Sequence, residues 1–422
     1  MRLHLQAKPC LTLFVLAFAL FPAYLKTVKA TDWPRFRGAN ADGKSPETNL
    51  LKKWPKAGPG MLWAIHGLGD GFASVAVAKG IIYTTGSVGK EKQGILSACD
   101  LKGSIIWKKP YGHGWSGSHP GTRTTPTVDA NSVYVISGYG NLVCFDAKTG
   151  NRKWHVDVLK RFNAKNINWG ISESVLVVDD KVICTPGGKN ASVVALNKSN
   201  GKTIWTTKGL SDQSAYCSPI LIEDGPKKIA VTITDKHIVA VNIDTGTVLW
   251  KYTNKLYKDE PRHVNPNTPV YSNKTVYMAS RFVGGTKLKI ADDWSKVSEI
   301  WTNQQLDPHH GGVVLVDGCI HGTDSRDEKW ICLDYQTGKV RYSAELVGKG
   351  SLIYADGMLY CYGQQGRLAL VKITPTAYEI AGSFEITQGR GPHWAHPAIS
   401  DGVLYIRHGD TLTAYDIKNK TP

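Results

Sequence analysis

Four loop-like segments of this sequence gather the side chains that could bind a ligand or carry out chemistry. They are rich in glycine, histidine and tryptophan, and they read Gly112-His-Gly-Trp-Ser-Gly-Ser-His119, Asn168-Trp-Gly-Ile-Ser-Glu173, Pro308-His-His-Gly-Gly312 and Gly391-Pro-His-Trp-Ala-His396. Imidazole rings can donate or accept a hydrogen bond, and indole rings can stack on a planar ligand. Because function concentrates on loops held by a rigid scaffold, these segments are the first candidates for a binding site.

A motif that recurs along the chain indicates which scaffold holds these loops. Its best copies are Phe145-Asp-Ala-Lys-Thr-Gly-Asn-Arg-Lys-Trp154, Leu196-Asn-Lys-Ser-Asn-Gly-Lys-Thr-Ile-Trp205 and Asn242-Ile-Asp-Thr-Gly-Thr-Val-Leu-Trp250. The aromatic residues that end the copies lie 41 to 51 residues apart, at Trp107, Trp154, Trp205, Trp250, Trp301, Tyr342 and Phe384. This period fits one four-stranded sheet per repeat. Asp-Gly, Thr-Gly and Asn-Gly dipeptides between the β-rich runs supply the turns of hairpins.

The chain contains seven complete repeats and two partial ones. Residues 394–416 supply three inner strands, and residues 59–66 near the N-terminus supply an outer strand with its own aromatic residue, Trp63. We predict an all-β, eight-bladed β-propeller of four-stranded blades, closed by pairing this N-terminal strand with the C-terminal blade, because closure removes open sheet edges. The predicted segments are a signal peptide at 1–30, an N-terminal extension packing on the propeller at 31–58, and the propeller at 59–422. We expect the periodic tryptophans to pack between blades.

The first thirty residues resemble a secretory leader. Arg2 and Lys8 precede an apolar run at 11–23, and small residues stand before Thr31. A membrane anchor is the alternative, but Pro22 and Lys26 leave the run too short to cross the hydrocarbon layer. Cys10 precedes the run and therefore cannot be the lipid-acceptor cysteine of a lipoprotein. The sequence thus predicts a periplasmic or secreted monomer with no transmembrane segment after cleavage.

The composition indicates the class of partner. The chain has 51 Lys and Arg against 35 Asp and Glu, a net charge of +16. Removing the four basic residues of the leader leaves +12, which favours anionic partners or serves solubility alone. We expect an envelope protein or an anionic ligand at the propeller rim, and no nucleic acid.

Seven cysteines remain after the leader, an odd number that argues against a fully paired disulfide framework. Most stand where strands carry Val or Ala, and only Cys319 and Cys332 are candidates for a bridge. No cluster of cysteines and histidines has the spacing of a zinc site.

Aligning the starts of the innermost strands brings one ring of residues to a common rim. The ring is bulky, aromatic and basic, and it consists of Phe72, Arg123, Ser172, Tyr216, Pro266, His310, Lys349 and Trp394. Two residues further along, the ring is small except for His396: Ser74, Thr125, Ser174, Ser218, Thr268, Gly312 and Ser351. Alternate residues of a strand point the same way, so both rings should face the channel. The loops before these strands add further histidines, among them His263 and His393.

The rim and its loops define the candidate ligand-binding residues. They are His113, Trp115, His119, Arg123, Trp169, Glu173, Tyr216, Asn267, His309, His310, Lys349, Trp394 and His396. An anionic or planar ligand suits this set. Two alternatives stay open: each loop histidine could be structural, and Glu173 could pair with Arg123 rather than act as a base. A metal ion held by His309, His310 or His396 is a further alternative, but adjacent histidines lack a diagnostic ligand spacing, so we predict no metal site.

The repeat, best seen from Asp146 to Trp154, resembles that of pyrroloquinoline quinone (PQQ) dehydrogenase propellers and of BamB-type outer-membrane assembly lipoproteins. The segments at 32–43, Trp169-Gly-Ile-Ser-Glu-Ser174 and His309-His-Gly-Gly-Val-Val314 resemble a group of exported bacterial PQQ-like propellers. The likeness covers essentially the whole chain after the leader.

The resemblance implies two different functions. Quinoprotein alcohol dehydrogenases generally carry a vicinal cysteine pair over the quinone and hold calcium with a Glu, Asn and Asp set. Here Glu173 and Asn267 match two of the three, no aspartate matches the third, and the chain has no Cys-Cys. It also lacks the lipid-acceptor cysteine of the assembly lipoproteins. The favoured interpretation is a non-catalytic exported propeller that binds a partner or ligand through its rim, with no cofactor. The alternative is a dehydrogenase of alcohols or sugars that uses PQQ and a divalent cation such as calcium.

Overall fold

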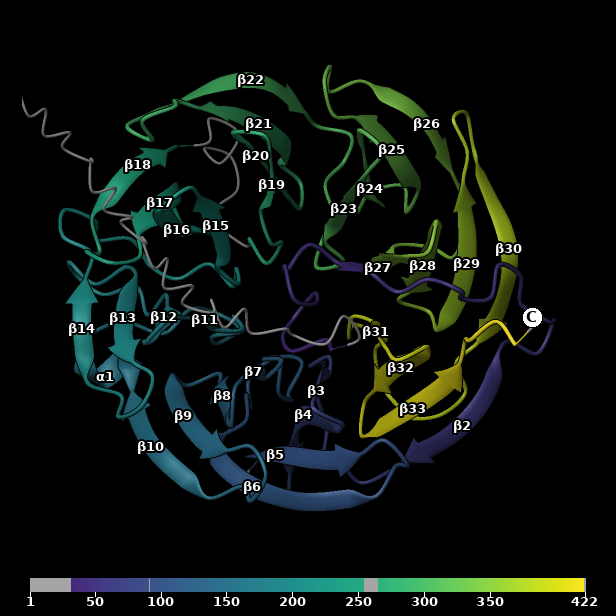
Figure 1. Cartoon of the computed structure of the whole chain (residues 1–422), viewed down its shortest axis with the longest axis horizontal. Coiled ribbons are helices and arrows are strands. Elements are labelled where there is room, and N and C mark those ends of the chain that lie inside the picture. The colour runs from purple at the N-terminus through teal and green to yellow at the C-terminus, as the bar shows by residue number, and fades with distance from the viewer. Residues whose placement is uncertain (1–31, 91, 254–264, 421–422) are drawn as a thin grey trace, which may run out of the picture.

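The computed structural model describes residues 32–90, 92–253 and 265–420, and these residues form eight antiparallel sheets arranged in a ring around a central channel (Figure 1). The predicted leader at 1–30 and the loop histidine His263 lie outside the described residues. Each sheet is one blade. In seven blades the strands follow the chain from the innermost to the outermost position, and in the eighth the outermost strand comes from the N-terminal side (Figure 1). The eight-bladed all-β propeller is therefore confirmed.

The first four blades fill residues 76–252. Blade 1 contains β3 (Ala76–Ala78), β4 (Ile81–Val88), β5 (Gln93–Asp100) and β6 (Ile105–His113). Blade 2 contains β7 (Thr127–Asp129), β8 (Ser132–Ile136), β9 (Asn141–Asp146) and β10 (Arg152–Asp157). Blade 3 contains β11 (Leu176–Val178), β12 (Lys181–Cys184), β13 (Val194–Asn197) and β14 (Thr203–Thr206). Blade 4 contains β15 (Ile220–Asp224), β16 (Lys227–Ile233), β17 (Ile238–Asn242) and β18 (Val248–Tyr252).

The other four blades complete the ring. Blade 5 contains β19 (Val270–Ser272), β20 (Thr275–Ser280), β21 (Gly284–Ile290) and β22 (Val297–Asn303). Blade 6 contains β23 (Val313–Val316), β24 (Cys319–Thr323), β25 (Trp330–Asp334) and β26 (Val340–Ala344). Blade 7 contains β27 (Gly350–Ala355), β28 (Met358–Gly363), β29 (Arg367–Ile373) and β30 (Tyr378–Glu385). Blade 8 contains β31 (Ala398–Ser400), β32 (Val403–His408), β33 (Thr411–Asp416) and, from the N-terminal side, β2 (Gly60–Ile65).

The last blade is built from both ends of the chain. Strand β2 pairs antiparallel with β33, with Gly60 opposite Asp416 and Ile65 opposite Leu412. The indole nitrogen of Trp63 donates to the carbonyl oxygen of Leu101 in blade 1 at 2.9 Å. Strand β2 thus completes blade 8 and contacts the next blade, as the partial repeats predicted.

The repeated motif is explained by contacts between neighbouring blades. The Trp154 indole donates to the carbonyl oxygen of Lys198 at 2.9 Å and covers the Asn-Gly turn of the next blade. Gly201 in that turn has φ +69°, and a Cβ there would lie 2.8 Å from the Trp154 ring. Trp107 and Trp205 repeat both contacts. Each turn therefore needs glycine both for its backbone conformation and because the preceding tryptophan occupies the space of a side chain.

The apolar core is a series of layers between blades rather than one central mass. One layer joins Leu176 and Ile183 of blade 3 to Ala230 and Val239 of blade 4. On the inner strands, residues that point to either side of a blade are therefore buried, which explains the continuous apolar runs of these strands.

The chain before β2 occupies the channel. Trp33 pairs with Val77 of the innermost strand β3, and β1 (Lys44–Ser45) pairs parallel with the innermost strand β27. Figure 1 shows this purple segment crossing the middle of the ring. It then leaves along blades 7 and 8, where Leu50 bridges to Lys418 and the Trp54 N–H donates to the Ala381 carbonyl oxygen at 3.2 Å.

Three smaller features complete the fold. One short helix, α1 (Val158–Arg161), follows β10, and the Asp157 carboxylate caps it by accepting the Lys160 N–H at 2.9 Å. No helix among the described residues is long and apolar enough to cross a membrane.

The suggested Cys319–Cys332 bridge is absent, because both residues are free thiols. Cys332 stands opposite His321 and Cys319 stands opposite Asp334, so the two cysteines are diagonal neighbours rather than a directly opposed pair.

Candidate functional site: a plugged aromatic cup

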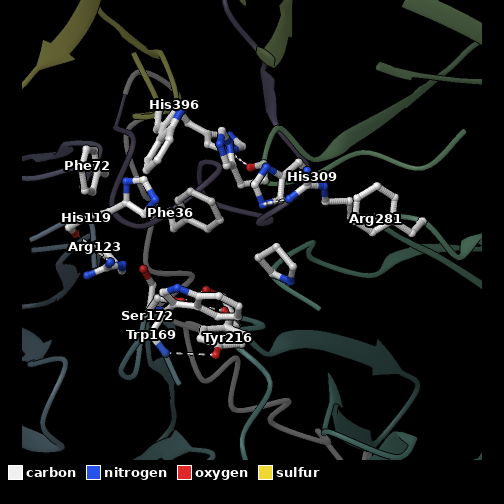
Figure 2. A pocket seen from close by; sticks show the side chains of 16 residues that line it. Phe36, Phe72, His119, Arg123, Trp169, Ser172, Tyr216, Arg281, His309 and His396 are labelled. Carbon is white, nitrogen blue, oxygen red and sulfur yellow. Dashed lines mark hydrogen bonds between the residues drawn. The ribbon is translucent and has the colours of Figure 1, made fainter. Parts of the chain in front are cut away.

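A cavity of about 380 Å³ lies at one mouth of the channel and is lined by rim residues of several blades. Figure 2 shows the lining side chains converging from all sides. They are Phe36, Phe72, His119, Arg123, Trp169, Ser172, Ser174, Tyr216, Ser218, Pro266, Arg281, Phe282, His309, His310, Trp394 and His396. This volume suits a small organic ligand. We call this cavity the cup.

Aromatic rings make up most of the cup wall. On one side, Trp394 packs against Phe72, with ring centroids 4.8 Å apart, and against His119 at 4.9 Å. Across the cup, the ring centroids of Trp169 and Tyr216 lie 6.1 Å apart, and the Tyr216 hydroxyl accepts a hydrogen bond from the Trp169 backbone N–H at 3.2 Å. Such surfaces favour a ligand with a flat, apolar body.

Arg123 is the cup's best-defined cation. Its guanidinium donates to the carbonyl oxygens of His119 (2.9 Å), Gly121 (3.2 Å) and Ser118 (3.3 Å), and it lies over the rings of Phe72 and Trp115. Burial lowers its pKa to about 10, so it remains charged at neutral pH. Among the described residues, no carboxylate forms an ion pair with Arg123. An anionic ligand group would supply the missing counter-charge.

Three histidines form a neutral, polar side of the cup. Burial lowers the pKa of His309 to about 2, that of His396 to about 3 and that of His310 to about 4. His396 Nε2 lies 2.7 Å from the His310 carbonyl oxygen, which can only accept, so Nε2 carries the proton and Nδ1 keeps a lone pair. His396 Nδ1 and both ring nitrogens of His310 are buried and have no hydrogen-bond partner among the described residues. These nitrogens therefore keep unused hydrogen-bonding capacity next to the cup, although they have almost no surface open to it.

Eight of the thirteen residues proposed from the sequence line the cup. They are His119, Arg123, Trp169, Tyr216, His309, His310, Trp394 and His396. Three others lie outside it. His113 is exposed at the end of the outermost strand β6. Trp115 lies under Arg123 and packs against Tyr139 with tilted rings, and Lys349 forms an ion pair with Glu328 at 2.9 Å.

Glu173 and Asn267 also point away from the cup, into the body of the propeller. Glu173 is fully buried, and its carboxylate accepts the Thr185 backbone N–H at 2.8 Å. No contact joins Glu173 to Arg123, so the suggested ion pair is not formed in the described structure. The Asn267 amide donates to the carbonyl oxygens of Pro308 and Ala279, and its oxygen accepts the Gly312 N–H at 3.1 Å. Asn267 therefore holds the loop that carries the paired histidines His309 and His310.

The cup does not offer the donor set that calcium requires. Calcium binds six to eight oxygen ligands, usually with several carboxylates. The described lining contains no Asp or Glu, and the two residues that match the calcium set of quinoprotein dehydrogenases are already engaged elsewhere. Within residues 32–90, 92–253 and 265–420, no three His, Cys, Asp or Glu side chains gather as a metal site.

Glu173→Gln is expected to stabilise the protein at pH 8 and to change its stability by less than about 1 kcal/mol at pH 5. Burial raises the pKa of Glu173 from 4.5 to about 7, so the folded state holds this proton more tightly than the unfolded state. The wild type therefore loses stability as the pH rises from 4.5 through 7. Glutamine keeps an oxygen for Thr185 and carries no charge, which should recover about 3 kcal/mol at pH 8. Urea unfolding at both pH values measures the difference.

The matched control for this variant is Glu379→Gln. Glu379 is an exposed partner of Lys372, so its replacement should change the free energy of unfolding little at either pH. An equal effect of Glu173→Gln at pH 5 and pH 8 would contradict the assignment of a buried, readily protonated carboxyl.

The residues that sequence reasoning missed come from outside the rim alignment. Arg281 and Phe282 lie at the end of β20, on the turn to β21, and the Phe282 N–H is held by the Asp307 carboxylate at 2.9 Å. Phe36 belongs to the segment inside the channel, and its ring lies 4.8 Å from that of His396. A search for aromatic and basic residues in the turn between the second and third strands of each blade would have found the first two. No repeat signal points to Phe36.

Comparison with known proteins places the chain among PQQ-like propellers. The family model described as outer membrane protein assembly factor BamB matches residues 91–343. BamB of Yersinia pestis is 21% identical over 284 residues, covering 63% of this chain and 67% of that protein. Quinoprotein ethanol dehydrogenase of Pseudomonas aeruginosa is 28% identical over 142 residues, which cover 31% of this chain but only 22% of the dehydrogenase. BamB of Shewanella oneidensis is 24% identical, with 36% of this chain and 37% of that protein covered.

Solved structures agree on the fold. BamB from Moraxella catarrhalis superposes with a TM-score of 0.64 at 14% identity, covering 85% of this chain and 100% of that one. Quinohemoprotein alcohol dehydrogenase from Comamonas testosteroni superposes with a TM-score of 0.65 at 13% identity, covering 93% and 81%. At these identities the likeness concerns the fold alone. The match of the family model to more than half of the chain carries the assignment: the chain belongs to the outer membrane protein assembly factor BamB family of PQQ-like β-propellers.

Proposed function

We propose that this propeller is a non-catalytic binding protein whose cup takes a small, planar, anionic ligand. The observation that carries the proposal is Arg123, a partly buried cation without a carboxylate partner in the described structure, at the edge of a cavity walled by Trp394, Phe72 and Trp169. A flat ring fits between these aromatic surfaces, and an acidic group of the ligand pairs with Arg123. The neutral rings of His310 and His396 complete the wall of the cup without adding charge.

The proposal includes an exported location and a partner in the cell envelope. The leader-like residues 1–30 and the family description as an outer membrane protein assembly factor support both. In this reading a ligand held in the cup, or a partner protein docked over it, meets the rim loops that carry His119, Trp169 and Trp394.

The alternative, a dehydrogenase that uses PQQ with calcium, is supported by the identity to quinoprotein ethanol dehydrogenase over 31% of the chain. The residues present do not fit its metal, since Glu173 and Asn267 are engaged away from the cup. This alternative requires PQQ binding that depends on calcium and dye reduction with alcohols or sugars. Our proposal expects neither, and a titration with PQQ in calcium and in chelator distinguishes the two.

Arg123→Gln is the variant that tests the proposed function. The probes are 2-naphthoate and its neutral isostere 2-naphthamide, titrated by calorimetry. A hydrogen bond to a charged group contributes about 1.5–3 kcal/mol, so we expect the variant to bind naphthoate about 10- to 100-fold more weakly and naphthamide unchanged. A purely structural role of Arg123 would weaken both probes alike, so the ratio of the two dissociation constants is the decisive readout.

The control variant is Arg367→Gln. Arg367 is an exposed arginine of β29 that donates to the Ser383 hydroxyl and does not line the cup. Its replacement should leave both dissociation constants unchanged. Equal affinity of the wild type for the acid and the amide, or no binding of either, would contradict the proposal.

A further inference from the structure

The segment at 33–45 forms the floor of the cup and is held on opposite sides of the channel. On one side, Trp33 and Val77 exchange two backbone hydrogen bonds of 2.8 Å, and the Val128 N–H donates to the Pro34 carbonyl oxygen at 2.8 Å. On the other side, the Tyr354 N–H donates to the Gly43 carbonyl oxygen at 2.8 Å, beside the pairing of β1 with β27. These partners belong to blades 1, 2 and 7, so the segment spans the channel below the rim.

A buried arginine fixes the middle of this segment. Arg37 is 2% exposed, and its guanidinium donates to the carbonyl oxygens of Val313 in blade 6 and Asp42. The space around it is full: a Cβ added at Gly312 would lie 2.2 Å from Arg37 Nη1, and one at Gly43 would lie 2.5 Å from Nη2. The backbone next to Phe36 therefore cannot retreat toward the far mouth of the channel without breaking these contacts.

Phe36 projects from this fixed backbone into the cup. Its ring meets that of His396 edge-on, with centroids 4.8 Å apart and planes at 67°. Figure 2 shows Phe36 between the side that carries Arg123 and Phe72 and the side that carries His309 and Arg281. Every other described lining residue comes from the blades and their loops, so Phe36 closes the cup from within.

We propose that Phe36 sets the depth of the cup and thereby selects aryl carboxylates by length. The inference rests on the proposed function, because it assumes that the acidic group of the ligand stays at Arg123. From there, the ring system of the ligand extends across the aromatic walls until it meets the Phe36 ring. Ligands that reach this floor bury their whole apolar surface, and longer ones collide with a side chain whose backbone is held on both sides.

The experiment is a length series of benzoate, biphenyl-4-carboxylate and terphenyl-4-carboxylate, titrated calorimetrically into the wild type, Phe36→Ala and Phe36→Trp. In the wild type, affinity should rise with each ring until the floor is reached and then fall. In Phe36→Ala, affinity should begin to decrease only at a ligand one ring longer. The ligand that the wild type rejects should bind this variant about tenfold or more tightly than it binds the wild type. Phe36→Trp should move the fall in the opposite direction. Benzoate affinity should stay within about twofold in all three proteins, since the acidic end is unchanged.

Phe282→Ala is the matched control, because Phe282 also lines the cup but is 40% exposed on the turn between β20 and β21. It should leave the length at which affinity falls unchanged. Suppose that the carboxylates bind well but their affinity begins to decrease at the same ligand length in the wild type, Phe36→Ala and Phe36→Trp. That result would overturn the role of Phe36 and leave the proposed function standing. Failure of all three carboxylates to bind the wild type would overturn the proposed function and this inference with it. Because the alanine and tryptophan variants predict opposite shifts, poor folding of one leaves the other as the test.

Discussion

Removal of residues 55–66 is expected to prevent the chain from folding to a closed propeller. These residues include β2, the outermost strand of blade 8, which pairs with β33 from Gly60 to Ile65. Without it, the edge of β33 is open, and the contact of Trp63 with the turn at Gly103 of blade 1 is lost. Both losses fall at the one joint where the two ends of the chain meet, so no neighbouring blade compensates for them. The expected result is a protein that aggregates or elutes as an expanded species, with no cooperative melting transition by circular dichroism.

Two companion variants separate the causes. Replacing Gly60–Ile65 by a Gly-Ser linker of equal length keeps the connection to the channel segment and should fail in the same way as the deletion. Trp63→Ala keeps the strand and loses only a partly buried side chain, which should cost about 1.5–3 kcal/mol while the protein still folds. Melting of the linker variant at the temperature of the parent would show that β2 does not close the ring.

Arg407→Met is expected to destabilise the protein by about 3 kcal/mol or more. Arg407 lies on β32, is 1% exposed, and donates to four carbonyl oxygens. The carbonyl groups of Gly409 and Thr411 belong to blade 8. Those of Gly69 and Thr85 belong to blade 1 or to the loop before it. A buried carbonyl left without a partner costs about 1–3 kcal/mol, and methionine fills the volume but donates no hydrogen bond. Because these hydrogen bonds join blade 8 to blade 1, their loss weakens the contact between the blades where the ring closes.

The free energy of unfolding from urea titrations measures this effect, and Arg390→Met is the matched control. The side chain of Arg390 is 68% exposed and pairs with Asp70 at 2.9 Å. An exposed ion pair contributes about 0–1 kcal/mol, so the control should change stability little. Equal effects of the two substitutions would contradict the assignment of Arg407 as a buried link between the first and last blades.

The fold was predictable because its determinants are local and repeated. Trp154 and Gly201 stand in consecutive copies of one motif, and their contact explains why the motif must recur at the length of a blade. The turns at Asp317 and Asp356 supply the positive φ that the hairpins need, at 46° and 48°. The partial repeats at the two ends of the chain could complete the ring only by pairing with each other, and β2 pairs with β33 as this requires.

The candidate site was predictable only in part, because alignment gives the position of a residue along a strand and not the contacts of its side chain. Arg123, Tyr216, His310 and Trp394 hold equivalent rim positions, and all four line the cup. Lys349 holds the same position, but Glu328, a residue outside the repeat motif, draws its ammonium into an ion pair.

A shift of one residue reverses the direction of a strand side chain. Glu173 and Asn267 fall between the two aligned rings, so they point into the propeller body, where each bonds to backbone groups. The same local alternation therefore accounts both for the residues that reach the cup and for those that do not.

The repeat period, the hairpin turns and the two partial repeats are enough to predict eight blades, the closing strand and most of the cup wall, since each depends on residues close together in sequence. The floor of the cup depends on tertiary structure. Phe36 lies in a segment without periodicity, and contacts with Val77, Val313 and Tyr354, which are distant in sequence, hold that segment across the channel. Protonation depends on tertiary structure for the same reason, because burial by several blades keeps His310 neutral and raises the pKa of Glu173 to about 7. Burial and long-range contact exist only once the ring has closed.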